Sequence, residues 1–165
     1  MLVSRSAIPL KGYKKVNTVD CINSFLEKAQ NHANKHDFDD RLTFRHAAIL
    51  ASGSKVISKG FNYLHISSLR FDAYAASMAR RLQNENHAET AAILRGRRKH
   101  DTRGMDVYVV RVNAKGELAQ SRPCELCQHV MYSHGIQRCF YSISPNEFGV
   151  MKVQNPAEKF FRVVD

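Results

Sequence analysis

Helical and strand-like patterns alternate along this chain, and the alternation constrains its fold more than any other feature. From Thr18, apolar residues recur at three- and four-residue steps, which predicts a helix. Segment 46–63 predicts two strands joined by a turn at Gly53. The pattern then continues with a helix at 87–94, a strand at 105–113, a helix at 124–136, a strand at 136–144 and a last strand at 150–153.

This order is typical of an α/β fold. We expect a three-layer α/β/α sandwich with a central mixed sheet of about five strands. A length of 165 residues suits one core, so residues 1–165 are predicted to form a single domain, with residues 1–15 irregular. The stretch from Leu64 to Glu85 fits a short helix or an ordered loop equally well.

The charge of the chain favours anionic partners. Twenty-five Lys and Arg against fifteen Asp and Glu give a net charge of +10. This balance suits a phosphate group or a polynucleotide as a partner. A basic cluster also stands out, and a solvated loop explains it as well as a phosphate contact does; its members are Arg95, Arg97, Arg98, Lys99 and Arg103.

The sequence gives no sign of a membrane protein or of a disulfide framework. No apolar run approaches the roughly 20 residues of a membrane helix, and the first residues lack a secretory signal, so we expect a cytoplasmic protein. Of the four Cys, only Cys124 and Cys127 form a close pair. Cys21 and Cys139 lie in apolar patterns, which favours burial for both.

Three residues at the starts of two predicted helices have the chemistry of a zinc site. Cys124 and Cys127 are three residues apart and so share one helix face, and His87 begins the other helix. Imidazole and thiolate ligands suit Zn²⁺ better than magnesium or calcium. Three protein ligands leave the fourth position of a catalytic zinc open to water.

Glu89 follows His87 by two residues, too close along the first helical turn to bind the same ion easily. Zinc lowers the pKa of a water that it binds, and a carboxylate beside that water can take a proton and later hand it to a leaving group. We therefore expect Glu89 to be the catalytic proton carrier.

His87-Ala88-Glu89 followed by Pro123-Cys124-Glu125-Leu126-Cys127 matches a known zinc deaminase signature. The chain closely resembles the cytidine/deoxycytidylate deaminase superfamily on these motifs. The resemblance runs from about Arg45 to Ser142, including a first hairpin that ends in Gly60-Phe61-Asn62. It implies a hydrolytic deaminase that uses zinc and acts on a nucleotide or a nucleic acid, and it allows a homo-oligomer.

The resemblance also implies substrate contacts. Asn62 would orient the sugar, although a turn residue that caps the second strand is an equal alternative. The N–H groups of Ala88 and Cys124 would hold the base carbonyl and the attacking oxygen. Main-chain oxygen near Ser121 or Arg122 would accept from the exocyclic amine. Tyr141 would lie near the base, with a core aromatic residue as the alternative, and His46 and His65 are weaker candidates for the pocket.

Four substrate hypotheses remain. The preferred one is conversion of a cytosine-type base to uracil on a nucleotide such as dCMP or CMP. A free nucleoside is less favoured, because nucleoside deaminases of this superfamily usually carry Cys where this chain has His87. A polynucleotide, either tRNA or single-stranded DNA or RNA, fits the basic charge. A non-catalytic, zinc-stabilised module that binds nucleic acid is the fourth, and Glu89 argues against it.

Overall fold

The computed structural model describes residues 2–4, 19–63 and 87–155. Within them, a seven-stranded mixed sheet has the order β1-β7-β6-β4-β2-β3, and β5 pairs with β4. Among the described strands, only β4 and β6 run parallel. The strands are β1 (Leu2–Ser4), β2 (Arg45–Ser52), β3 (Lys55–Phe61), β4 (Asp106–Val112), β5 (Leu118–Ala119), β6 (Arg138–Ser144) and β7 (Glu147–Lys152).

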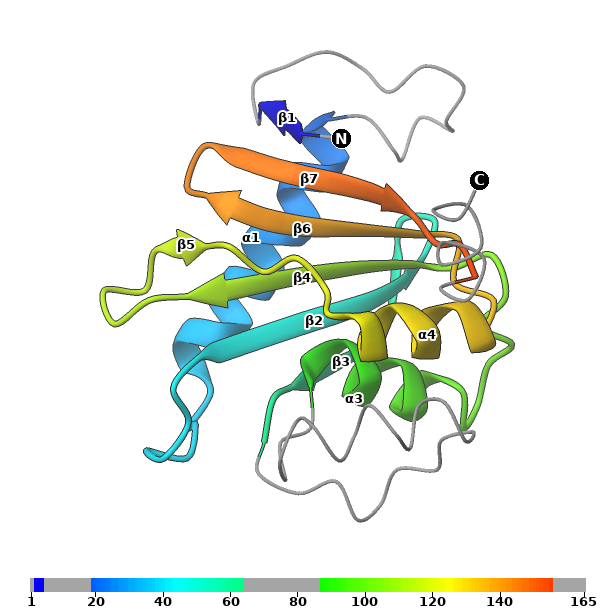
Figure 1. The fold of residues 1–165 in the computed structure, drawn as a ribbon, viewed down its shortest axis with the longest axis horizontal. Coiled ribbons are helices and arrows are strands. Elements are labelled where there is room, and N and C mark those ends of the chain that lie inside the picture. Colours follow the sequence, from blue (N-terminus) through cyan, green and yellow to red (C-terminus); the bar gives the residue numbers. More distant parts are fainter. Residues whose placement is uncertain (1, 5–18, 64–86, 156–165) are drawn as a thin grey trace, which may run out of the picture.

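Helices cover both faces of this sheet, which confirms the predicted three-layer sandwich. Helix α1 (Val19–Lys35) lies behind the sheet in Figure 1, and α3 (Ala88–Gly96) and α4 (Glu125–Ser133) lie in front of it. The segment 64–86, for which the sequence left a helix and a loop open, lies outside the described residues.

Two separate cores form because side chains alternate along each strand. Ala47 and Ile49 of β2 face α1, where Tyr108 of β4 stacks on Phe25 with ring centroids 4.4 Å apart. The residues that alternate with these along β2, β4 and β6 point to the other face of the sheet and pack against α3 and α4. They include Ala48, Leu50, Val107, Val109, Cys139 and Tyr141. This second core supports the helices that carry the predicted zinc ligands.

The sheet has more strands than the sequence predicts. Strand β1 pairs with β7, so residues 2–4 are not irregular as expected, and β5 pairs with Arg111 and Val112 at the end of β4. Three-residue and two-residue strands are too short to show an alternating pattern, and both depend on pairing with a longer neighbour.

A buried ion pair joins the two parallel strands. Arg138 of β6 donates two hydrogen bonds, of 2.9 and 2.6 Å, to the carboxylate of its cross-strand partner Asp106. Both side chains are 5% exposed. The bidentate pairing compensates for taking the two charges out of water, and it fixes β4 against β6.

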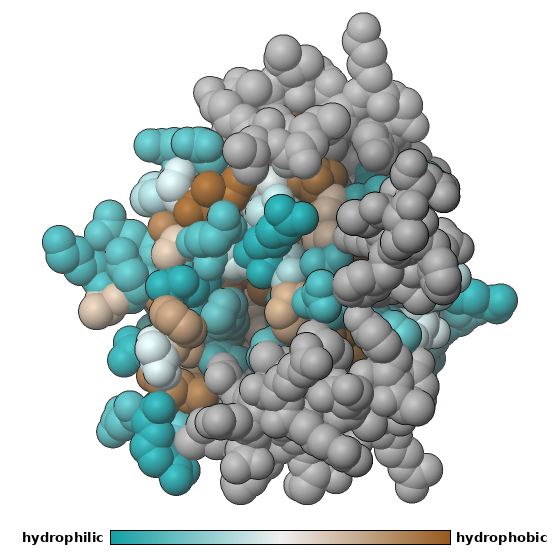
Figure 2. Space-filling view, viewed as in Figure 1, coloured by the Kyte–Doolittle hydropathy of each residue, from teal (hydrophilic) through white to brown (hydrophobic). Residues whose placement is uncertain are grey.

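Among the residues coloured in Figure 2, hydrophilic side chains prevail, and hydrophobic ones form separate small patches. The homo-oligomer stays a prediction. Among the described helices, none combines the length and the apolar character that a membrane span requires.

Candidate functional site

Helices α3 and α4 lie side by side, and both begin at the same end of the molecule (Figure 1). His87 and Cys124 are the residues immediately before these helices, with extended backbone at φ −92° and −71°. Neither side chain caps its helix. The side chains of His87 and Cys124 can therefore meet in the space between the two helix N-termini. The partial positive charge of these N-termini favours the thiolate form of a cysteine.

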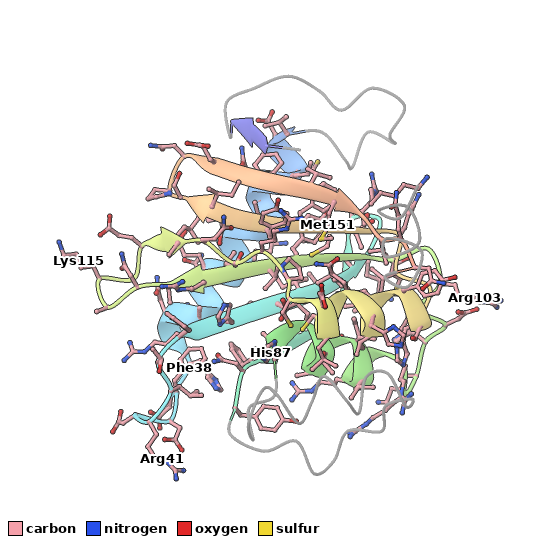
Figure 3. All side chains as sticks on the ribbon, in the orientation of Figure 1. Phe38, Arg41, His87, Arg103, Lys115 and Met151 are labelled. Carbon is pink, nitrogen blue, oxygen red and sulfur yellow. The ribbon has the colours of Figure 1, made fainter. Side chains whose placement is uncertain are left out.

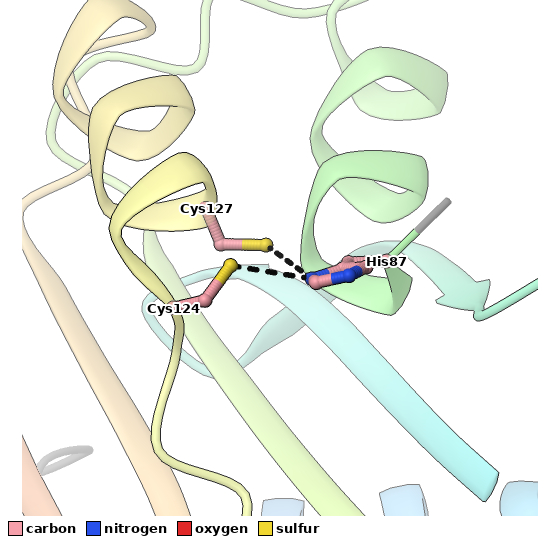
Figure 4. A group of neighbouring side chains, drawn as sticks. All are labelled: His87, Cys124 and Cys127. Atoms are coloured by element: carbon pink, nitrogen blue, oxygen red, sulfur yellow. Dashed lines mark hydrogen bonds between the residues drawn. The ribbon is translucent and has the colours of Figure 1, made fainter. Parts of the chain in front are cut away.

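The three predicted ligands meet at one point (Figure 4). The Nδ1 atom of His87 lies 3.4 Å from the sulfur of Cys124 and 3.3 Å from that of Cys127. All three donor atoms lie within 4.8 Å of one another. Tetrahedral zinc with ordinary ligand distances separates a nitrogen and a sulfur ligand by about 3.6 Å. The donor set and its spacing therefore fit zinc.

The two cysteines have different surroundings. A hydrogen bond from Cys127 and the neighbouring His87 lower the pKa of Cys124 to about 4, while the same hydrogen bond and then burial raise the pKa of Cys127. The Thr90 hydroxyl lies 3.7 Å from the Cys127 sulfur. This hydroxyl is placed to support a thiolate ligand from outside the coordination shell.

Glu89 lies in the first turn of α3 and is only 4% exposed. Burial raises the pKa of its carboxyl group to about 7, and the neighbouring His87 opposes that rise. A carboxyl group whose pKa is near neutrality can both accept and donate a proton.

Glu89 shares a pocket with two of the predicted ligands. The pocket is lined by Phe44, His46, His87, Glu89, Ser121, Arg122 and Cys124. The backbone N–H of His46 donates to Asn62, and burial, His87 and Arg111 lower the pKa of the His46 imidazole to about 4. The pocket thus combines a neutral imidazole, a buried carboxyl group and one cysteine sulfur.

The predicted substrate contacts are distributed unevenly around this pocket. Ser121 and Arg122 line it, and Ala88 is buried directly beside His87. The hydroxyl of Ser121 donates to main-chain oxygen of Val109 at 2.9 Å, so this residue anchors its loop on β4.

Asn62 and Tyr141 do not line the pocket. The Asn62 amide bridges the backbone of Phe44 and His46, with hydrogen bonds of 2.7 and 2.8 Å. Tyr141 belongs to the core under α3 and α4. Their placement matches the alternative that the sequence left open for each, and their roles toward a substrate stay predictions. His65 lies outside the described residues.

The basic cluster lies far from the pocket. Arg95 is in the last turn of α3, and the other members follow that helix, whereas His87 precedes it. A nine-residue helix is about 13 Å long. Figure 3 accordingly shows Arg103 and His87 at opposite ends of the paired helices. A group bound beside the zinc ligands would therefore not reach this cluster directly.

Sequence reasoning missed Phe44, Thr90 and Arg111 as neighbours of the site. One feature of the sequence could have identified Phe44. It precedes His46 and Ala48 at two-residue spacing, so it is expected on the same side of β2, the side that faces α3 and α4. Arg111 reaches the same place only because β2 and β4 pair with His46 opposite Arg111.

Comparisons with known proteins agree with this geometry. Residues 19–143 match a family described as the cytidine and deoxycytidylate deaminase zinc-binding region. A cytidine deaminase from Burkholderia pseudomallei superposes with a TM-score of 0.54 at 19% identity, over 79% of this chain and 91% of that one. The dCMP deaminase of cyanophage S-TIM5 superposes with a TM-score of 0.50 at 13% identity, over 74% and 82%. None of the curated proteins matches this chain by sequence.

Proposed function

The chain belongs to the family of the cytidine and deoxycytidylate deaminase zinc-binding region, and from this premise we propose that it is a zinc-dependent hydrolytic deaminase that converts a cytosine-type base to uracil. One observation carries the proposal. Glu89, a buried carboxyl group that is not needed as a ligand, lines the same pocket as His87 and Cys124. A purely structural zinc site has no use for a carboxyl group in this position.

In the proposed reaction, His87, Cys124 and Cys127 would hold the zinc ion. Bound there, zinc would act as a Lewis acid that lowers the pKa of water. Glu89 would take a first proton from the attacking water and deliver it to the ring nitrogen N3, and would then take the second proton from the oxygen added at C4 and pass it to the departing amine. Water oxygen is added at C4 and ammonia leaves, so a carboxyl group that both accepts and donates protons suits both transfers.

Several residues would orient the base. The backbone N–H groups of Ala88 and Cys124 would hold the carbonyl and the attacking oxygen, since both lie at helix N-termini. Main-chain oxygen near Ser121 or Arg122 would accept from the exocyclic amine. Asn62 would act on the sugar through the strand end that it fixes, and Tyr141 would support the floor below the site.

A nucleotide such as dCMP or CMP is the proposed substrate. The exposed Arg122 at the pocket and the net charge of +10 both suit a phosphate group. The cyanophage enzyme of similar fold was solved with dCMP and dUMP. We further propose that residues 1–165 form one deaminase domain and that it acts in the cytoplasm.

A polynucleotide substrate is the second candidate. The observation in its favour is the distance between the pocket and the basic cluster at the other end of α3, because only an extended ligand can contact both. Such a substrate would lose affinity steeply as salt is added, since each phosphate contact releases counterions.

A deamination panel tests these hypotheses. It offers dCMP, CMP, deoxycytidine, cytidine, guanine, and short single-stranded DNA and RNA to the zinc-loaded protein at two salt concentrations. The proposal expects the highest kcat/KM for a cytosine mononucleotide, with little dependence on salt. Turnover of oligonucleotides alone, with strong salt dependence, would favour the second candidate. Deamination of none of them would reject the enzyme.

A further inference from the structure

Phe44 and His46, which line the pocket, contact each other and form a stack with Arg111, which lies behind them. Phe44 lines the pocket although its side chain is 43% exposed. The Arg111 guanidinium lies over the Phe44 ring, 4.0 Å from its centroid. The His46 ring packs against the same phenyl group edge-on, at 6.3 Å and 78°. An exposed phenylalanine and an arginine thus hold each other at the mouth of the pocket.

The position of this stack is fixed by the sheet. Arg111 of β4 is the cross-strand partner of His46, and Ala119 of β5 pairs with Arg111 from the other side. Two residues after Ala119, Ser121 is anchored to Val109, and Arg122 follows directly. The loop that carries Arg122 therefore runs back along β4 from Arg111 to the pocket.

Arg111 and Arg122 differ from three other described arginines in that no carboxylate of the described residues forms an ion pair with them. Within residues 2–4, 19–63 and 87–155, neither has an ion-pair partner, whereas Arg41, Arg103 and Arg138 each pair with an aspartate. The centre of the Arg111 guanidinium lies 4.0 Å from the centroid of the Phe44 ring, and a cation–π contact of this kind does not use the N–H groups as hydrogen-bond donors. A guanidinium held in this way is suited to bidentate contact with a phosphate group.

We propose that Arg111 and Arg122 form a phosphate-binding subsite at the mouth of the pocket, with Phe44 as the positioning residue that holds the Arg111 guanidinium in place. The inference rests on the proposed function: binding of the phosphate group by Arg111 and Arg122 would make a nucleotide the preferred substrate. The phosphate group can belong to a free mononucleotide or to a strand, because the two share the same chemistry.

Binding of reaction products tests the subsite without any turnover. Deoxyuridine, dUMP and a short single strand with one internal deoxyuridine are titrated against the zinc-loaded protein. We expect Arg111→Gln to weaken binding of a phosphate-bearing ligand by about 10- to 100-fold, and to leave deoxyuridine binding unchanged. The ligand that shows this loss, dUMP or the strand, identifies the source of the phosphate.

Arg45→Gln is the matched control. Arg45 also lies at the start of β2 and its loss removes the same charge, but it is adjacent to His46 and so faces the opposite side of the sheet. Phe44→Leu removes the ring and should lose part of the phosphate preference, whereas Phe44→Tyr should keep it. A loss of phosphate preference in Phe44→Leu but not in Phe44→Tyr would show that the aromatic ring positions Arg111, and does not merely fill space.

The inference is overturned if Arg111→Gln leaves the affinity for both phosphate-bearing ligands unchanged relative to deoxyuridine, or if Arg45→Gln lowers it as much. Its failure is separable from that of the proposed function. Phosphate binding that depends on Arg111 in a protein that deaminates nothing would reject only the enzyme. Deamination with phosphate binding that does not depend on Arg111 would reject only the subsite.

Discussion

Thr90 contacts the proposed zinc site from one residue beyond Glu89, through the 3.7 Å approach of its hydroxyl to the Cys127 sulfur. Replacing Thr90 with valine keeps the shape of the side chain and removes this contact. Loss of such an outer support typically costs 10- to 100-fold in metal affinity, so we expect at least about a 10-fold weaker zinc affinity in competition with a chelator.

Thr102→Val provides the control for that measurement. Thr102 is also buried, and its hydroxyl donates a 2.7 Å hydrogen bond to main-chain oxygen of His134, at the far end of α4. Its loss should lower stability but leave the zinc affinity unchanged. Equal zinc affinities of the two variants would show that Thr90 has no special role.

His46 should make the stability of the protein depend on pH. Its pKa is lowered from 6.5 to about 4, so the folded state favours the neutral imidazole. The stabilisation is therefore complete above pH 6.5 and is lost as the pH falls toward 4. Between pH 7 and pH 5 the loss amounts to about 2 kcal/mol.

Urea unfolding of the wild type and of His46→Gln at pH 7 and pH 5 isolates this contribution. The wild type should lose more stability than the variant over this interval, because only the wild type has the imidazole that must become charged on unfolding. A variant that loses as much as the wild type would assign the pH dependence to other groups.

The sequence predicts some residues of the site better than others, for a physical reason. His87, Glu89, Cys124 and Cys127 lie at two helix starts, and spacing along a helix already places them. Arg111 has no such signal. Its position beside the pocket depends on strand pairing across a gap of more than sixty residues, which no local pattern contains.

At the scale of elements, the site depends on how closely β3 approaches α3. Gly60 makes this approach possible, because a Cβ atom there would overlap the Ala88 carbonyl oxygen and the Ala92 nitrogen. Both are backbone atoms and cannot move aside without moving the helix that follows His87. Gly60→Ala should therefore lower stability by about 1–3 kcal/mol and also reduce zinc content.

Gly53→Ala is the control that separates the loss of stability from the loss of zinc content. Gly53 has φ +59° in the turn between β2 and β3, and nothing lies within 4 Å of the position that a Cβ atom would take. Alanine there costs about 1 kcal/mol through the backbone alone. Zinc content should be normal in this variant. Normal zinc content in Gly60→Ala as well would contradict the proposed coupling between β3 and the ligands.

Long helices and strands can be predicted from the sequence more easily than short ones. Long periodic segments give α1, α3, α4 and the central strands directly from the sequence. Strand β5 spans only Leu118–Ala119, and its assignment depends entirely on its partner β4. The order of the strands, with β4 between β2 and β6, likewise comes from packing and not from any single segment.

For the whole molecule, total charge was predictable and its arrangement was not. The net charge of +10 is read directly from the sequence, but Arg122 lies at the pocket while Arg103 lies at the other end of the paired helices (Figure 3). In the described part of the chain, basic residues therefore lie in two regions, one at the pocket and one at the far end of the helices. A mononucleotide can use only the region at the pocket.

The central claim is that His87, Cys124 and Cys127 bind zinc and that Glu89 moves protons beside it. Zinc content and deamination rate, measured on the same preparations of wild type and Glu89→Gln, test it most directly. The account predicts a single zinc ion per chain in both proteins and a rate lower by about 10²- to 10⁴-fold in Glu89→Gln. Wild-type protein without zinc, or full activity in Glu89→Gln, would contradict it.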